Sequence, residues 1–158
     1  DAVMAVVALC EAAAYYASRG ETLWDAMLAM YERYGYYAED LASLTLQGAD
    51  GAEKIARMMS SLREHPAERV GARRVLALRD YACGIRYDLA AKTQAPTGLP
   101  KSNVLYFELE DGAWCCVRPS GTEPKIKFYF GVKGASLSDA HAQLDTLKRD
   151  FLQIFTEE

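Results

Sequence analysis

The feature that most constrains the fold is a run of alternating residues from 103 to 132, interrupted twice by turn residues. "NVLYFELE" and "AWCCVR" flank Asp111 and Gly112, and "KIKFYFGV" follows a second interruption. Successive side chains of a strand point to opposite faces, so this alternation predicts half-buried strands. Asp-Gly between two such runs favours a two-residue hairpin. The stretch therefore predicts consecutive antiparallel strands.

The amino-terminal part predicts a pair of helices. Residues 2–18 are rich in alanine and apolar on most sides, which is typical of a helix buried in a larger body. "SRGET" at 18–22 ends this helix, and Thr22 with Asp25 has the spacing of a capping box for a second one. Gly35 is the expected stop of that second helix.

A strand and a third helix are expected next. Ala42, Leu44 and Leu46 alternate with polar residues, which predicts a half-buried strand. Asp50 is the expected N-cap of a helix, with Glu53 at the reciprocal position. "EHPAERVGA" after this helix predicts a loop.

The rest of the chain predicts further strands and a last helix. "RRVLALRDY" and "IRYDL" are strand-like runs around a bend near Gly84, and "KTQAPTGLPKS" predicts a turn-rich loop. Ser136 with Asp139 is expected to open the last helix. The order indicates an α+β fold, with one mostly antiparallel sheet and two helices packed on a face, in residues 37–158. Residues 1–36 are the helical pair, which is expected to belong to a different domain.

Bulk composition excludes several classes of function. The net charge of −4 disfavours a nucleic-acid-binding protein, and no apolar stretch is long enough to cross a membrane. We also find no signal peptide. The cysteines, Cys10, Cys83, Cys115 and Cys116, form no CxxC pattern, so we expect buried, reduced thiols in a cytoplasmic protein rather than a metal or redox site.

The stretch "RPSGTEPKIKFYF" at 118–130 concentrates groups that bind anions. Gly121 permits backbone angles closed to other residues, so the amides of Ser120, Gly121 and Thr122 could form an anion-binding nest. Arg118 offers a planar fork that matches phosphate oxygens. Lys125 and Lys127 are expected to share the outward face of the strand that follows, with Ile126, Phe128 and Phe130 facing inward.

The same residues have a second interpretation. A Pro-Ser-Gly-Thr run is also ordinary turn chemistry, and the two lysines could simply be solvated. Glu123 cancels part of the local positive charge. The residue types alone leave an oxyanion site and a plain turn both open.

The motif also resembles a known family. "RPSGTEPKIKFYF" is similar to the phosphate-binding loop in the last domain of the α-D-phosphohexomutases. "LPKSNVLYFELEDGAWCCVRPSGTEPKIKFYFGVKG" resembles the bacterial phosphoglucomutase branch almost throughout, and "CEAAAYYASRGETLWDAMLAMYERYGYY" resembles the helices that close the third domain. The resemblance implies a small TBP-like C-terminal domain at 37–158, preceded by the end of the third domain at 1–36.

This resemblance implies a function and a set of site residues. Family members interconvert glucose 1-phosphate and glucose 6-phosphate through glucose 1,6-bisphosphate, using a phosphoserine and a magnesium ion. The last-domain loop binds the phosphate of the phosphorylated hexose that does not react. Carried over by position, the residues that bind this phosphate are Arg118, Ser120, Gly121 and Thr122, together with Lys125, which matches a position that is often basic in this branch.

Several motifs of the family do not occur in this sequence. We find no phosphoserine loop, no D-x-D-x-D metal motif and no G-E-x-S sugar-recognition loop. Together with the start at Asp1, this leads us to expect a fragment without catalytic or metal-binding residues of its own. Magnesium would be bound by N-terminal domains outside this chain, and the fragment would not be active alone.

Alternatives to this interpretation remain. The parent could be a phosphomannomutase or a phosphopentomutase, because the loop recognises phosphate and not the stereochemistry of the sugar hydroxyls. The chain could also be a freestanding α+β phosphate-binding module. The apolar faces of the helices in residues 1–36 are expected to dock either on the domain formed by residues 37–158 or on another copy of the chain.

Overall fold

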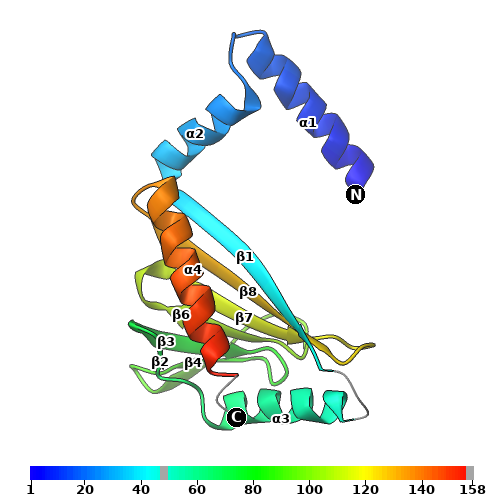
Figure 1. The fold of residues 1–158 in the computed structure, drawn as a ribbon, viewed down its shortest axis with the longest axis vertical. Coiled ribbons are helices and arrows are strands. Elements are labelled where there is room, and N and C mark those ends of the chain that lie inside the picture. Colours follow the sequence, from blue (N-terminus) through cyan, green and yellow to red (C-terminus); the bar gives the residue numbers. More distant parts are fainter. Residues whose placement is uncertain (47–49, 156–158) are drawn as a thin grey trace. The chain divides into compact units, whose positions relative to one another are not determined.

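The computed structural model describes residues 1–46 and 50–155, and the chain divides into two compact units, residues 1–36 and 37–158. Each unit is a separate body of secondary structure with its own internal contacts (Figure 1). The assignment of the two units to a third and a fourth domain stays a prediction.

The first unit is a pair of helices, α1 (Ala2–Ala17) and α2 (Leu23–Tyr34). The predicted capping box is confirmed: the Asp25 amide donates to Thr22 Oγ1 at 3.1 Å, and the Thr22 amide donates to Asp25 Oδ2 at 2.8 Å. Gly35, with φ of 112°, ends α2 as predicted. These short-range hydrogen bonds satisfy amides that a helix start leaves without partners.

Neither helix buries a residue, and α1 exposes a row of large apolar side chains. Val3, Met4 and Leu9 are each more than half exposed, at 72%, 65% and 64%. An apolar helix without burial gains none of the packing energy that normally stabilises a helix. The expected docking of this face, on residues 37–158 or on another copy of the chain, stays a prediction.

The described residues of the second unit form a sheet of eight strands. Seven of them have the order β1-β8-β7-β6-β3-β4-β5, and the eighth, β2, pairs with β3. The pairings β2–β3, β3–β4, β3–β6, β4–β5, β6–β7 and β7–β8 are all antiparallel, as predicted. The strands are β1 (Tyr36–Thr45), β2 (Arg69–Val70), β3 (Arg73–Asp80), β4 (Ile85–Asp88), β5 (Thr93–Pro96), β6 (Leu105–Leu109), β7 (Trp114–Pro119) and β8 (Lys125–Gly134). The helices are α3 (Gly51–Glu64) and α4 (Leu137–Gln153).

The core lies between α4 and one face of the central strands. Figure 1 shows α4 lying lengthwise over the sheet. The ring of Phe151, on α4, lies 5.5 Å from Phe107, 6.3 Å from Phe128 and 5.9 Å from Phe130, measured between centroids, and all four side chains are buried. These rings come from β6, β8 and α4, so a single aromatic cluster joins the sheet to the helix.

Asp111 and Gly112 form the turn between β6 and β7, as predicted, but three residues (Glu110–Gly112) connect the strands instead of the two expected, because the Leu109 amide already donates to the Ala113 carbonyl at 2.9 Å. Asp111 has φ 60° and ψ 20°, and Gly112 has φ 71°, so both central residues adopt the left-handed conformation of a type I′ turn. The Ala113 amide closes the turn on the Glu110 carbonyl at 3.2 Å. The turn sets the register in which Glu108 lies opposite Trp114.

Three local predictions are wrong. Residues 93–96, expected in a loop, form the edge strand β5, where Pro96 is tolerated because an edge strand leaves amide positions unpaired. Residues 69–70, also expected in a loop, form the short strand β2, which pairs with β3, whereas the strand predicted from the alternation at 42–46 is confirmed as the end of β1. Asp50 precedes α3 but makes no side-chain capping bond, because its backbone lies in the helical region (φ −88°, ψ −1°) instead of the extended one that a capping residue needs.

Gly131 on β8 lets an indole lie against the sheet. Trp114 is its cross-strand neighbour, and a Cβ at Gly131 would come within 2.3 Å of the Trp114 ring. The Trp114 ring also stacks on Tyr106, with centroids 5.4 Å apart and planes 17° from parallel. The glycine is required here for space, and the aromatic pair covers part of the sheet face opposite α4.

We expect Gly131→Ala to lower the free energy of unfolding by about 1–3 kcal/mol, the usual cost of overpacking. Urea unfolding would measure this change. The same substitution should be nearly neutral in a Trp114→Ala background, because the indole it displaces is gone. An equal cost in both backgrounds would show that the indole is not the cause.

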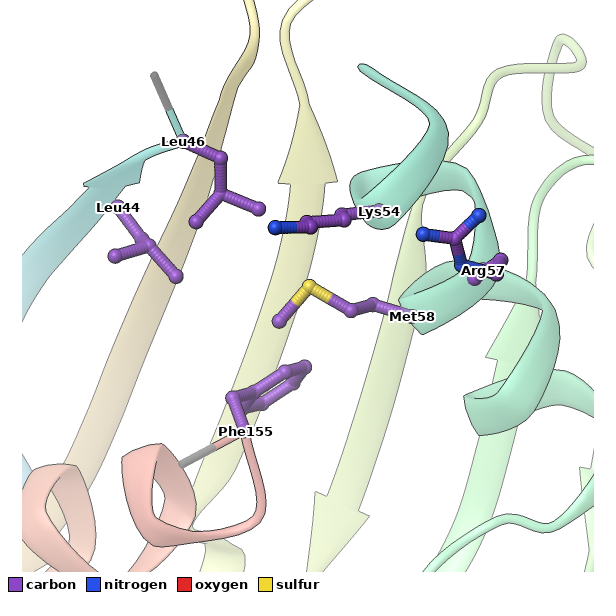
Figure 2. A pocket seen from close by; sticks show the side chains of 6 residues that line it. All are labelled: Leu44, Leu46, Lys54, Arg57, Met58 and Phe155. Carbon is purple, nitrogen blue, oxygen red and sulfur yellow. The ribbon is translucent and has the colours of Figure 1, made fainter. Parts of the chain in front are cut away.

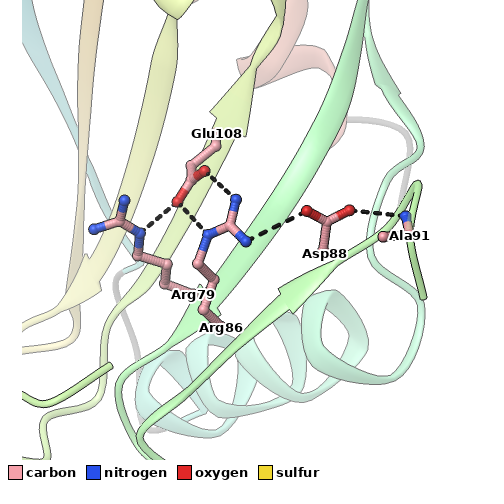
Figure 3. A network of polar contacts seen from close by, with 5 residues as sticks. All are labelled: Arg79, Arg86, Asp88, Ala91 and Glu108. Atoms are coloured by element: carbon pink, nitrogen blue, oxygen red, sulfur yellow. Dashed lines mark hydrogen bonds and ion pairs between the residues drawn. The ribbon is translucent and has the colours of Figure 1, made fainter. Parts of the chain in front are cut away.

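An ion-pair network on the face opposite α4 ties β3, β4 and β6 together (Figure 3). Arg86 donates to Glu108 through Nε at 2.9 Å and through Nη2 at 2.7 Å, and Arg79 Nε donates to the same carboxylate. Arg86 also reaches Asp88, which accepts the Ala91 amide at 2.8 Å. The hydrogen bond from Arg86, followed by that from Arg79, lowers the pKa of Glu108 in spite of its partial burial.

Glu108→Gln should destabilise the chain at pH 7 by about 1–3 kcal/mol, the worth of hydrogen bonds to a charged group. Because the pKa of Glu108 is lowered from its ordinary value of 4.5, the carboxylate contributes fully above that value. Its contribution is lost as the pH falls through the folded-state pKa, so the gap between wild type and variant should close in acid. Urea unfolding from pH 7 to pH 3 would measure this gap.

Glu39→Gln is a suitable control, because the Glu39 side chain is exposed and makes no hydrogen bond or ion pair within residues 1–46 and 50–155. If Glu39→Gln and Glu108→Gln follow the same pH profile, the network is not the source of the effect.

Candidate functional site

The residues predicted to bind phosphate lie on the hairpin that connects β7 to β8. Arg118 pairs with Lys127 and Pro119 with Ile126 at the end of this ladder. Residues 120–124, here called the 120–124 loop, complete the connection. The Ser120 amide donates to the Lys125 carbonyl at 2.7 Å, which closes the loop at its base. The loop therefore sits on a rigid two-strand support.

The Ser120 hydroxyl organises the inside of the loop. Its Oγ accepts the Thr122 amide at 3.4 Å and the Glu123 amide at 3.3 Å, as in a serine turn. The predicted nest of three inward amides is wrong in one respect, because the Ser120 amide is used to close the hairpin. The hydroxyl oxygen provides a local acceptor that the sequence pattern did not reveal.

Gly121 has a different role from the one predicted. Its φ is not in the left-handed region, so backbone freedom is not what the position requires. A Cβ placed on Gly121 would meet nothing within 4 Å. The glycine instead leaves the tip of the loop open, so that a ligand could approach the backbone closely.

The cations next to the loop lie on one face of the sheet, as predicted. Ile126, Phe128 and Phe130 are buried at 0%, 1% and 0% exposure, and Lys127 between them is exposed. Arg118 is exposed directly across from Lys127. The structure thus brings Arg118, Lys125 and Lys127 to the outward face at the base of the loop.

These cations have no acidic partner in the part of the chain that the structure describes. The side chains of Arg118, Lys125 and Lys127 make no hydrogen bond or ion pair there, whereas those of Arg63, Arg79 and Arg86 all pair with carboxylates. Like charges directly opposite each other on neighbouring strands repel. An anion bound between Arg118 and Lys127 would remove this repulsion, so the arrangement favours a negatively charged ligand.

The neighbouring thiols are not reactive groups. Cys115 is buried and Cys116 is half-buried on the opposite face, as the alternation predicted. Burial raises the pKa of Cys116 to about 11, against a smaller lowering effect from Arg118, so the thiol is neutral at physiological pH. All four cysteines are free, but Cys10 and Cys83 are exposed, so the prediction of buried thiols is wrong for these two.

The described residues do not provide a metal site. No group of three or more histidine, cysteine, aspartate or glutamate residues that could hold a metal ion occurs among them. The magnesium ion that the family resemblance implies therefore does not fit the residues of this part of the chain. Within residues 1–46 and 50–155, no helix is long and apolar enough to span a bilayer.

A separate hollow of about 380 Å³ lies between the end of β1, α3 and the residue Phe155 (Figure 2). Its lining is Leu44, Leu46, Lys54, Arg57, Met58 and Phe155. None of the predicted phosphate-binding residues lines it, and most of the lining is apolar. Phosphate binding needs several hydrogen-bond donors, so the exposed 120–124 loop is the better candidate.

The fold and the loop together define a class: a small α+β domain with an antiparallel sheet, in which exposed cations flank the loop of one hairpin. The profile described as "Phosphoglucomutase/phosphomannomutase, C-terminal domain" matches residues 67–145, which is half of the chain and includes the loop. The chain belongs to this family.

Several similar proteins are phosphoglucomutases, which agrees with this membership. The phosphoglucomutase of Staphylococcus aureus (strain bovine RF122 / ET3-1) is 33% identical over 147 residues, which cover 93% of this chain and 26% of the relative. The phosphoglucomutase of strain USA300 gives the same values, and that of strain N315 is 32% identical. The chain thus spans about a quarter of the length of these curated relatives.

Proposed function

We propose that the 120–124 loop, with Arg118 and Lys125, binds the phosphate group of a phosphorylated hexose. The observation that carries this proposal is the cluster of cations on the outward face at the base of the loop, whose side chains have no acidic partner within the described residues. The open backbone at Gly121 and the hydroxyls of Ser120 and Thr122 add donors within the same few residues. Family membership supports the same assignment.

In this proposal the domain acts by positioning. Arg118 binds two phosphate oxygens with its planar guanidinium group, and the loop hydroxyls and amides bind the remaining oxygens. The phosphate held here is the one that does not react, so the sugar can present its other end to the reacting groups. Holding the substrate in this way lowers the entropy cost of reaction without any proton transfer.

We further propose that the parent protein is a phosphoglucomutase that interconverts glucose 1-phosphate and glucose 6-phosphate through glucose 1,6-bisphosphate. The names of the relatives, and the fact that the chain covers only 26% of their length, support this. The phosphoserine and the magnesium ion would then come from N-terminal domains of a longer chain. The loop contacts phosphate only, so mannose or pentose phosphate would fit it equally well.

Replacing Arg118 with Ala should weaken phosphate binding by about 1.5–3 kcal/mol, the worth of hydrogen bonds to a charged group. This corresponds to about a tenfold to a hundredfold increase in Kd. Amide NMR signals of residues 120–125 would be followed at low salt during titration with inorganic phosphate and with glucose 6-phosphate.

Arg57→Ala is the matched control, because Arg57 is an exposed arginine on α3 whose ion pair with Glu53 is long, at 3.7 Å. The proposal fails if the loop signals of the wild type do not move at millimolar ligand. It also fails if the two arginine variants lose the same affinity.

The purified chain of residues 1–158 should not convert glucose 1-phosphate, even with magnesium and glucose 1,6-bisphosphate present. The physical reason is that it supplies a phosphate-binding loop but no acidic metal cluster among its described residues. A coupled assay for glucose 6-phosphate would test this, with an intact phosphoglucomutase as the positive control. Magnesium-dependent turnover by the chain alone would contradict the assignment.

A further inference from the structure

The 120–124 loop is tied to the rest of the domain at one place outside its own hairpin. The Leu46 amide, just after β1, donates to the Pro124 carbonyl at 3.0 Å. Among the described residues this is the only hydrogen bond that joins the loop to a segment other than β7 and β8. The position of Pro124 therefore depends on where Leu46 lies.

Leu46 lies directly against Gly51, the first residue of α3. Gly51 is buried, and a Cβ added to it would lie 2.2 Å from the Leu46 carbonyl oxygen and 3.0 Å from Pro124 Cβ. The nearest of these atoms belongs to the backbone, which cannot turn aside as a flexible side chain can. Gly51 thus brings the start of α3, the end of β1 and the loop into direct contact.

The requirement at Gly51 is for space. Its φ is not in the left-handed region, and it lies in a helix, where alanine is intrinsically the better residue. Helix propensity alone would therefore favour alanine at this position. The contact with Leu46 and Pro124 opposes that preference, so the two effects predict opposite results for one substitution.

We propose that Gly51 is a positioning residue for the phosphate-binding loop, an inference that rests on the proposed function. A side chain at 51 displaces Leu46 and, through the hydrogen bond between them, Pro124. The loop then shifts with respect to Arg118, which stays fixed on β7. Phosphate oxygens can no longer reach the guanidinium group and the loop donors at the same time.

The test compares Gly51→Ala with a matched glycine variant at the opposite end of β8. A Cβ at Gly134 would lie 2.5 Å from the Ala140 amide nitrogen, so Gly134→Ala also forces a helix start away from the sheet, but far along β8 from the loop. Leu46→Pro is a third variant, which removes the donor to Pro124 without adding bulk at Gly51. Urea unfolding checks that each variant is folded.

Two measurements are made on each chain: the positions of the amide signals of residues 120–124 without ligand, and the Kd for inorganic phosphate. We expect Gly51→Ala and Leu46→Pro to move these signals and to raise the Kd by at least about tenfold, since small misplacements of binding groups are costly. Gly134→Ala should change neither. Wild-type affinity in Gly51→Ala, or an equal loss in Gly134→Ala, would overturn the proposal.

The two proposals can fail separately. If the wild type does not bind phosphate, the proposed function is wrong, and the ligand-free signals alone decide whether Gly51 positions the loop. If the wild type binds phosphate but the loop signals of Gly51→Ala coincide with those of the wild type, the function stands and the role of Gly51 is refuted.

Discussion

The contact between Phe151 of α4 and the inward-facing phenylalanines of β6 and β8 determines the rest of the second unit. Phe128 and Phe130 are buried against this ring, so the register of β8 is fixed. A slip of one residue would turn every inward side chain outward. Burial of the aromatic side chains therefore also places Lys125 and Lys127 on the outward face. The location of the positive charge follows from the packing of the core.

Charge pairing separates the loop from the rest of the sheet. The outward face carries arginines elsewhere, but Arg79 and Arg86 are neutralised by Glu108 and Asp88, and Arg74 by Glu110. The chain has more acidic than basic residues, 22 against 18, so partners for Arg118 and Lys127 were available in the composition. No carboxylate of the described residues pairs with Arg118 or Lys127, although Glu123 lies in the loop, so an unpaired cluster of positive charge remains on an acidic protein. A small positive patch on a protein with a net charge of −4 favours a small anion over an extended polyanion such as a nucleic acid.

Features that depend on a few neighbouring residues could be predicted from the sequence. The Asp111–Gly112 turn and the capping box of Thr22 and Asp25 form as expected, because each is closed by hydrogen bonds within the segment itself. The predictions that were wrong concern features that depend on the tertiary structure or on the backbone conformation. β5 is a strand only because β4 offers it an edge, and Asp50 is not a side-chain cap because its backbone is already helical. Family membership, which the loop motif indicated, is confirmed.

The glycines show the same limit of prediction from the sequence. The sequence suggested that Gly121 was needed for its backbone angles, but its φ is unremarkable and its surroundings are empty. Gly51 and Gly131 drew no prediction, yet each is required where another atom approaches, at Leu46 and at Trp114. A glycine that adopts a left-handed turn can be inferred from its neighbours in the chain. One that provides space cannot, because the atom it accommodates is distant in sequence.

The hydrogen bonds inside the loop are suited to exchange with a ligand. Ser120 Oγ holds the Thr122 and Glu123 amides at 3.4 Å and 3.3 Å, longer than ordinary bonds of this kind. Bonds of this length are weak, so phosphate oxygens can replace the hydroxyl as acceptor at little cost. The hydroxyl is then free to donate to the phosphate itself. The base of the loop, closed at 2.7 Å between Ser120 and Lys125, need not move during this exchange. A base held by this hydrogen bond and a tip with weaker ones would lose little conformational entropy on binding, as the phosphate site that we propose would require.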